Sequence, residues 1–422
     1  MTRPARNCFR NLATHRQTAT VALMLTLLFV LTAAPAARAQ TYQVIHNFTG
    51  GPDGSNPLGR LSIDGGGHLY GATYGGGIPY DGGFGVVFRM SPKGSGWTFS
   101  SILTFTTTSD GGDPDSGVAF GPGGLLYGTT SNGGTVFTLA PSPTFPRTVF
   151  APWAINWLYS FPLHKDAPYG DLAFDSVGNI YGVTATGGSN LCFDNQGCGM
   201  VYELTPTGGP WLLTILYIFQ GGADGAYPAG VTLDAAGNLV GTAANGGTHD
   251  DGVIFQLTPG GNGWTESVLY NFDCNGHDGC IPQAGLVSDA AGNLYGSTAS
   301  TYPTIFEFSP SKGGWTYTVL ANVPPQYQTG PTAPLTMDAA GNLYGTLGTR
   351  DNYELTGAVF EVTHGNSGWT FTSLHDFTGG NDGAAPSSTV AMDGKGNLYG
   401  TAIYGGPNCR PVGCGVVWEI TP

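Results

Sequence analysis

DAAGNLYGT, at residues 338–346, decides how this sequence folds, because versions of it recur seven times along the chain. One glycine marks each copy, and neighbouring marks lie 49 to 59 residues apart. The marks are Gly71, Gly128, Gly182, Gly241, Gly296, Gly345 and Gly400. A period of about 50 residues, with several short strand-like runs in each unit, is typical of propellers and of repeat arrays.

The fourth copy contains all the elements of one unit. Its residues 230–234 (GVTLD), 239–243, 253–258 (VIFQLT) and 264–272 (WTESVLYNF) have the composition of short strands. Turns rich in glycine or proline separate these runs. Four short strands joined in this way predict one antiparallel blade of a propeller.

The last unit lacks its fourth strand, and the missing strand is found near the start of the chain. Residues 42–48 (YQVIHNF) match residues 371–377 (FTSLHDF), which form the fourth strand of the sixth unit. We therefore predict an all-β fold, a seven-bladed β-propeller of four-stranded antiparallel blades. Its ring is closed where residues 42–48 pair with residues 416–421, so that no apolar edge is left open.

The first 39 residues have the features of a Sec-type signal peptide. Four arginines precede an apolar run at residues 21–32, and Ala37-Arg38-Ala39 supplies a small-x-small cleavage pattern. We expect cleavage after Ala39, with residues 40–422 forming one propeller domain that is secreted or periplasmic. No second apolar segment follows, so we expect no membrane insertion after cleavage. An uncleaved anchor is the alternative.

The charge of the chain argues against nucleic acid as a partner. Without the signal segment the chain has nine basic and 28 acidic residues, a net charge of −19. Binding to a phosphate backbone requires clustered Lys and Arg. This acidity favours solubility, and we expect a monomer.

Six cysteines follow the signal segment, in three local pairs. Even number, short spacing and export together predict the disulfides Cys192–Cys198, Cys274–Cys280 and Cys409–Cys414. A metal site is the alternative, but no C-x-x-C pair or His-rich partner accompanies these residues.

Several polar and aromatic residues recur at fixed positions, and each has a structural and a functional interpretation. The repeated Asp is interpreted as a turn residue rather than as one of a ring of cation sites. It occurs at Asp64, Asp175, Asp234, Asp289, Asp338 and Asp393. The repeated Tyr and Trp are interpreted as core between blades, with a sugar platform as the alternative. The recurrent D-G-x-x-P is interpreted as a turn between blades, although it could also line the channel mouth.

The repeat resembles the Gloeobacter–Verrucomicrobia repeat of exported bacterial proteins. The residues that carry the resemblance are DAAGNLYGT at 338–346, GVVF at 85–88, LTP at 257–259 and GWTxxxL at 368–374. The D-x-x-G-N-L-Y core is also similar, more loosely, to NHL-type propeller repeats. The resemblance implies an exported protein and supplies no catalytic residues.

Function is expected on the face that carries the variable connections between second and third strands, because loops of a regular scaffold accept variation. The charged candidates for ligand binding in these loops are Asp81, Asp194, His249, Asp250, Asp251, Arg350, Asp351, Glu354 and Arg410. No catalytic or metal-binding residue is predicted. Asp250–Asp251 is the only acidic doublet in these loops, and with no EF-hand pattern it is a weak candidate for Ca²⁺.

Three functions remain open at this point. The first is a non-enzymatic binding or scaffold module for glycan or protein, without a cofactor. The second is a carbohydrate-active hydrolase or lyase, which would need two close carboxylates and a cleft. The third is a structural envelope protein with loops stabilised by Ca²⁺. An aromatic shelf without paired carboxylates would favour the first.

Overall fold

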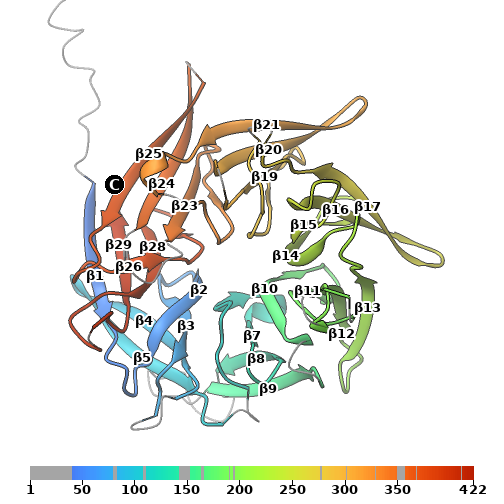
Figure 1. Ribbon diagram of the computed structural model, residues 1–422. Coiled ribbons are helices and arrows are strands. Elements are labelled where there is room, and N and C mark those ends of the chain that lie inside the picture. Colours follow the sequence, from blue (N-terminus) through green and yellow to red (C-terminus); the bar gives the residue numbers. More distant parts are fainter. Residues whose placement is uncertain are drawn as a thin grey trace, which may run out of the picture. The chain divides into compact units, whose positions relative to one another are not determined.

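Antiparallel sheets of short strands build the unit formed by residues 42–421, and a computed structural model describes their arrangement (Figure 1). The described residues are 40–78, 83–107, 111–141, 153–162, 166–189, 191–192, 195–275, 278–300, 302–327, 329–348, 357–366, 368–409 and 411–422. In this part of the chain the strands form seven sheets, which are the blades of a propeller. The predicted fold class is confirmed.

The first four blades follow one another along the chain. Blade 1 contains β2 (Ser55–Ile63), β3 (Leu69–Gly75), β4 (Val86–Lys93) and β5 (Gly96–Thr104). Blade 2 contains β6 (Val118–Phe120), β7 (Leu126–Thr130), β8 (Thr135–Pro141) and β9 (Trp153–Ser160), with η2 (Pro122–Gly124) in its first turn. Blade 3 contains β10 (Pro168–Phe174), β11 (Ile180–Thr184), β12 (Met200–Thr205) and β13 (Leu212–Ile218). Blade 4 contains β14 (Ala226–Leu233), β15 (Leu239–Asn245), β16 (Val253–Gly260) and β17 (Gly263–Asn271).

The remaining three blades complete the ring. Blade 5 contains β18 (Val287–Ser288), β19 (Leu294–Ser297), β20 (Thr304–Ser311) and β21 (Gly314–Asn322). Blade 6 contains β22 (Thr336–Met337), β23 (Leu343–Gly348), β24 (Gly357–Gly365) and β25 (Gly368–Phe377), and η5 (Pro325–Tyr327) precedes it. Blade 7 contains β26 (Ala384–Pro386), β27 (Ala391–Met392), β28 (Leu398–Tyr404), β29 (Val416–Thr421) and β1 (Thr41–Asn47). Among all described residues, no helix is long and apolar enough to cross a membrane.

The repeated Asp builds the turn between the first and second strands of its blade. In blade 4, Asp234 Oδ1 accepts hydrogen bonds from the N–H groups of Ala236 and Asn238, both at 2.8 Å. Asp234 Oδ2 accepts a hydrogen bond from Asn238 Nδ2 at 2.7 Å. Asp289, Asp338 and Asp393 hold their turns in the same way. The interpretation of this Asp as a turn residue is confirmed.

The glycine that marks each repeat is required because a neighbouring backbone or ring approaches it closely. A Cβ at Gly241 would lie 2.4 Å from the carbonyl oxygen of Gly230 and 2.7 Å from Cζ of Phe255. At Gly345 the nearest atom would be Cζ of Phe360, at 2.5 Å. No side chain fits in either space, and so the residue is invariant across the seven copies.

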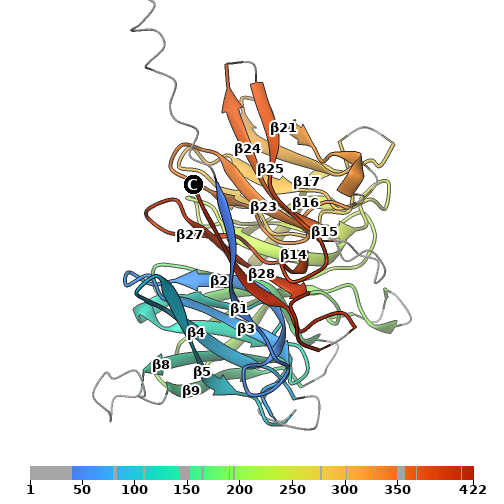
Figure 2. The same cartoon turned by 90° about the vertical axis from the view of Figure 1, so that its left-hand side faces the viewer.

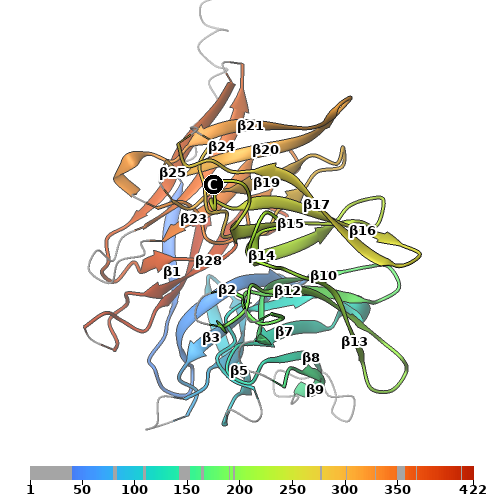
Figure 3. The same ribbon diagram turned by 45° about the vertical axis from the view of Figure 1, so that its right-hand side comes forward.

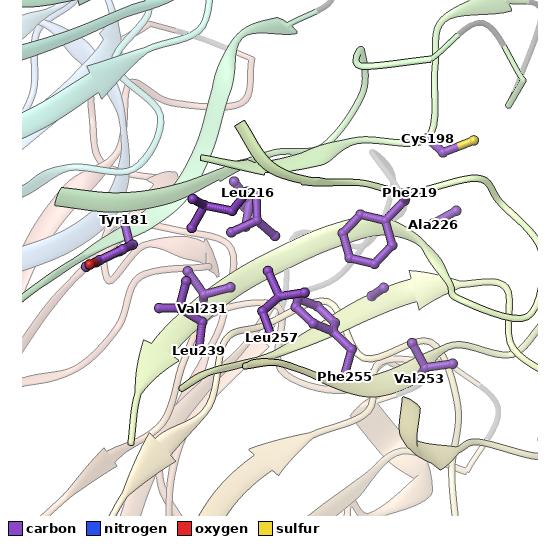
Figure 4. Close-up of a cluster of buried hydrophobic side chains, with 13 residues drawn as sticks. Tyr181, Cys198, Leu216, Phe219, Ala226, Val231, Leu239, Val253, Phe255 and Leu257 are labelled. Atoms are coloured by element: carbon purple, nitrogen blue, oxygen red, sulfur yellow. The ribbon is translucent and has the colours of Figure 1, made fainter. Parts of the chain in front are cut away.

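Apolar side chains from adjacent blades fill the space between them. Between blades 3 and 4, Phe219 and Leu216 pack with Phe255, Leu239 and Leu257, all of them buried (Figure 4). The repeated Trp and Tyr also meet across blade boundaries, as the edge-to-face pairs Tyr70–Trp153, Tyr181–Trp264 and Trp97–Tyr399. Their interpretation as inter-blade core is confirmed.

β1 closes the ring by pairing with β29, as predicted (Figure 1), and Figure 2 shows β1 from the side, along the strands of blade 7. Phe48, just after β1, is buried and donates its N–H to the carbonyl oxygen of Gly415 at 3.1 Å. Phe105 makes the equivalent bond to Gly85 within blade 1, also at 3.1 Å. The split blade therefore reproduces the bonding of a continuous one.

The D-G-x-x-P segment forms both a turn and a connection between blades. Asp53 accepts hydrogen bonds from the N–H of Thr49, which confirms the turn. The residue before the proline, such as Asn56 with φ +54°, donates its N–H to the carbonyl oxygen of Cys414 in the preceding blade. The proline that follows, Pro57, packs against Gly415, the residue after Cys414. A Cβ at Gly415 would lie only 2.4 Å from Cδ of Pro57. The position of this segment between blades was predicted from the sequence, but its contacts with the preceding blade were not.

The three predicted disulfides are all present, with Cα atoms 5.0 Å, 5.1 Å and 5.2 Å apart. We expect peptide mapping under non-reducing conditions to recover the same three pairs from the oxidised protein.

Replacing Cys192 and Cys198 by Ala should lower the free energy of unfolding by about 2 kcal/mol, since the bond closes only a short loop. Urea titration measures this loss, and free thiols in the protein recovered from its native compartment would contradict the pairing.

Candidate binding face and central channel

One face of the ring carries both the second-to-third-strand loops and the connections between blades, because neighbouring strands in each blade are antiparallel. We call this the long-loop face and the opposite one the turn face. The turn face carries the Asp turns and the ends of the third-to-fourth-strand hairpins. Figure 3 shows two of these hairpins, β16–β17 and β20–β21, extending from the ring.

All three disulfides stabilise the long-loop face. A Cβ at Gly221 would lie 2.3 Å from Sγ of Cys192, and one at Gly50 would lie 2.7 Å from Sγ of Cys409. Both bonds therefore pack against the inter-blade connection that follows their own loop. The Cys274–Cys280 bond lies within such a connection.

Three of the predicted ligand-binding residues lie in the described part of this face, in the loop after β15. His249 and Asp250 are exposed, and Asp250 Oδ1 accepts a hydrogen bond from the N–H of Gly246 at 3.0 Å. Asp251 Oδ2 accepts one from the N–H of Cys274 at 2.9 Å. These two carboxylates shape the loop, and their role toward a ligand stays a prediction. Asp81, Asp194, Arg350, Asp351, Glu354 and Arg410 lie outside the described residues.

Asp251 also lies beside the Cys274–Cys280 disulfide, with its carboxylate and both sulfur atoms within 4.8 Å of one another. Thiolates bind metal ions strongly, but these two sulfur atoms are bonded to each other. The group is therefore explained by the bonds that hold the loop.

A pocket of about 390 Å³ opens on the long-loop face over blades 3 to 5. Its polar lining consists of Tyr169, Tyr227, Asn245 and Gln283, and we call it the tyrosine pocket. Tyr169 is 41% exposed and Tyr227 is half-buried. Ala185, Pro228, Ala229 and Ala244 complete the lining. Among these described residues, none is Asp, Glu, His or Cys.

Tyr169 and Tyr227 reach the pocket because of where they stand in their first strands. Tyr169 follows Pro168 directly, and Tyr227 precedes Pro228 with φ +57°. The N–H of Tyr227 bonds to the carbonyl oxygen of Cys198 in blade 3 at 2.9 Å. The connection between blades therefore fixes the backbone that presents the ring of Tyr227.

The residues of the pocket were not predicted from the sequence, although the repeat contains a signal for two of them, Tyr169 and Gln283. The proline in or just before the first strand recurs in every blade, and the residue after it differs in every blade. This position is occupied by Leu58, Asp115, Tyr169, Ala229, Gln283, Thr332 and Ser387. Five of these seven line the rim of the central channel. Variation at one position of a regular strand therefore indicated the site.

The central channel contains an ion pair between β2 and β10. Arg60 Nη1 lies 3.3 Å from Asp171 Oδ2, and both side chains are half-buried. The pair joins blade 1 to blade 3 past Gly117 of blade 2, whose Cβ would lie 2.3 Å from the carbonyl oxygen of Arg60. Because Gly117 has no side chain, the strands of blades 1 and 2 come close together.

Two carboxylates lie near each other at the entry to blade 2, outside the tyrosine pocket. Asp113 accepts a hydrogen bond from Asn132 Nδ2 at 3.0 Å. Asp115 Oδ1 is buried without a hydrogen-bond partner. Burial, together with the charge of Asp113, raises the pKa of Asp115 to about 7. Burial and both carboxylates raise the pKa of the neighbouring Tyr74.

Comparison with known proteins identifies the repeat and the fold. Residues 27–191 match the family described as the Gloeobacter/Verrucomicrobia repeat, which confirms the resemblance over that part of the chain. No curated protein matches the sequence.

Several solved structures resemble this chain at low sequence identity. A streptogramin B lyase is 13% identical, with a TM-score of 0.59 over 92% of this chain and 99% of its own. A catalytically inactive virginiamycin B lyase from Staphylococcus aureus, bound to quinupristin, is 15% identical, with a TM-score of 0.51 over 91% and 99%. A fungal alcohol oxidase with copper is 13% identical, with a TM-score of 0.57 over 91% and 77%. At these identities the likeness shows the fold alone.

Proposed function

We propose that this protein is an exported propeller that binds a glycan in the tyrosine pocket without transforming it. The observation that supports this most directly is the pocket itself, about 390 Å³ in volume and lined by two tyrosines, Asn245 and Gln283. It lies on the face where the loops vary, which is where a regular scaffold can change specificity at little cost in stability.

The side chains of the pocket match the chemistry of a sugar. A tyrosine offers a flat apolar ring on which the C–H face of a pyranose can stack, and it keeps a polar tip for solvent. Asn245 and Gln283 each carry both a hydrogen-bond donor and an acceptor, as does every sugar hydroxyl. An uncharged lining favours a neutral glycan over an acidic one.

One observation favours a second candidate, a carbohydrate-active hydrolase. The pKa of Asp115 is raised to about 7, which suits a general acid, and Asp113 lies beside it. However, neither carboxylate lines the tyrosine pocket, and Asp113 is engaged by Asn132. Binding without turnover therefore accounts for more of the site.

A glycan and polysaccharide array probed with residues 40–422, in Ca²⁺ and in EDTA, tests the proposal. We expect saturable binding to at least one neutral glycan, equal in both buffers, and no product when that glycan is incubated with the protein and analysed by chromatography. Release of product would support the hydrolase. A melting temperature that falls in EDTA would support Ca²⁺-stabilised loops, and an array without any binding would refute the proposal.

Tyr169→Ala should weaken binding of the best glycan by about tenfold or more, because a stacking aromatic residue is a typical hot spot. Tyr74→Ala is the matched control, since Tyr74 has the same 41% exposure on the long-loop face but lies in blade 1, outside the pocket. Calorimetric titration of both variants measures the difference. Equal losses in the two variants would contradict the assignment of the pocket.

A further inference from the structure

The channel on the turn-face side of Arg60 contains space that glycan binding does not use. Two adjoining cavities lie there, of about 520 Å³ and about 920 Å³. Arg60, Phe174 and Met337 line both of them. Because they share these lining residues, we treat the two cavities as one chamber, which we call the lower channel.

The walls of the lower channel are apolar at one repeated position, the residue before the turn Asp or, in blade 2, before Gly121. In chain order this position is Ile63, Phe120, Phe174, Leu233, Ser288, Met337 and Met392. All except Leu233 and Ser288 line the larger cavity, and Leu233 lines the smaller one. Each of the six apolar members is only half-buried. Methionine side chains adapt well to a flexible aliphatic partner.

Arg60 is the only basic residue among the described residues that line the channel cavities. Its Nη1 contacts Asp171 at 3.3 Å, which is a long bond for a charged pair. Its Nε is buried and has no acceptor. A buried N–H without an acceptor is rare, because it loses its bond to water and gains nothing in return. Nε is therefore shielded from the chamber, and Arg60, which lines both cavities, can reach a ligand there only through its terminal nitrogens.

We propose that the lower channel binds a medium-chain fatty carboxylate, with the carboxylate on Arg60 and the chain along the apolar wall. A carboxylate can accept hydrogen bonds from both terminal nitrogens of a guanidinium at once. Asp171 occupies Arg60 when no ligand is bound and competes with the ligand for it. Asp338 and Asp393 stand at the lower mouth, so entry is favoured by salt that screens them.

Calorimetry on the mature protein with decanoate, decanol and acetate tests both halves of the proposal. Decanoate should bind, and decanol should bind at least about tenfold more weakly, since it lacks the charge that Arg60 recognises. Acetate, which has the head group alone, should not bind measurably. Decanol binding as tightly as decanoate, or acetate binding as tightly, would overturn the proposal.

The two members of the ion pair should respond in opposite directions. Arg60→Gln should weaken decanoate binding at least about tenfold, whereas Asp171→Asn should tighten it, since the competing carboxylate is removed. Thermal melting checks that both variants fold. If Arg60→Gln does not fold, Asp171→Asn and decanol still decide the question. Unchanged affinity in Arg60→Gln, or unchanged or weaker affinity in Asp171→Asn, would overturn the proposal, and glycan binding at Tyr169 is tested independently.

Discussion

Deleting residues 40–48 should abolish the folded monomer. The deletion removes β1 and the buried Phe48, and so it exposes one edge of β29 and the apolar cluster that contains Trp418, Val416 and Ile420. An apolar edge of this kind pairs with other chains, so we expect aggregation on export or refolding. The single change Phe48→Ala should lower the free energy of unfolding by about 3–5 kcal/mol. Size-exclusion chromatography and urea unfolding measure the two effects.

A rearranged chain provides the control for this deletion. Placing residues 40–48 after Pro422 through a short Gly-Asn turn gives blade 7 a continuous third-to-fourth-strand hairpin, as in the other six blades. This chain should fold and melt close to the parent. If the truncated chain melts like the parent, or the rearranged chain fails to fold, closure by β1 does not hold the ring together.

Gly241→Ala should destabilise blade 4. The new Cβ would lie 2.4 Å from the carbonyl oxygen of Gly230 and 2.7 Å from the ring of Phe255, and neither can retreat within a packed blade. Overpacking of this kind costs about 1–3 kcal/mol or more in the free energy of unfolding. Urea unfolding followed by tryptophan fluorescence measures the loss.

Gly261→Ala is the matched control, because its Cβ would have no neighbour within 4 Å and its φ is not in the left-handed region. It lies in the hairpin turn of the same blade and should change the free energy of unfolding by less than about 0.5 kcal/mol. Equal losses in the two variants would mean that any Gly→Ala change in this blade is destabilising, and that the close contact at Gly241 is not the cause.

The fold could be predicted from the sequence because the residues that form the turns and strands of a blade recur in seven copies. Asp234, Gly237 and Asn238 suffice to define a turn, and their copies define the others. The fourth strand missing after β29 could be found in residues 42–48, since both carry the pattern of an aromatic residue closing a strand. The connection between blades was only half recognised, because the contact of Pro57 with Gly415 joins residues far apart in the sequence.

The candidate site was harder to predict, because it is formed where the repeat is broken. Charge in the loops pointed to Asp250 and Asp251, yet both carboxylates accept hydrogen bonds from the backbone of the loops. Tyr169, Tyr227 and Gln283 come from three blades, and only the ring brings them together. The pairing of Arg60 with Asp171 likewise depends on which residues face the channel, and the spacing within one repeat does not show this.

The central claim is that a closed seven-bladed ring presents its glycan site on the long-loop face, and hydrogen–deuterium exchange with and without the bound glycan tests it most directly. We predict slower exchange in peptides covering residues 166–170, 226–229, 245–252 and 281–283. Residues 206–209 and 259–263, which form turns on the opposite face, should exchange at unchanged rates. Protection of those turns, with none around Tyr169 and Tyr227, would contradict the account.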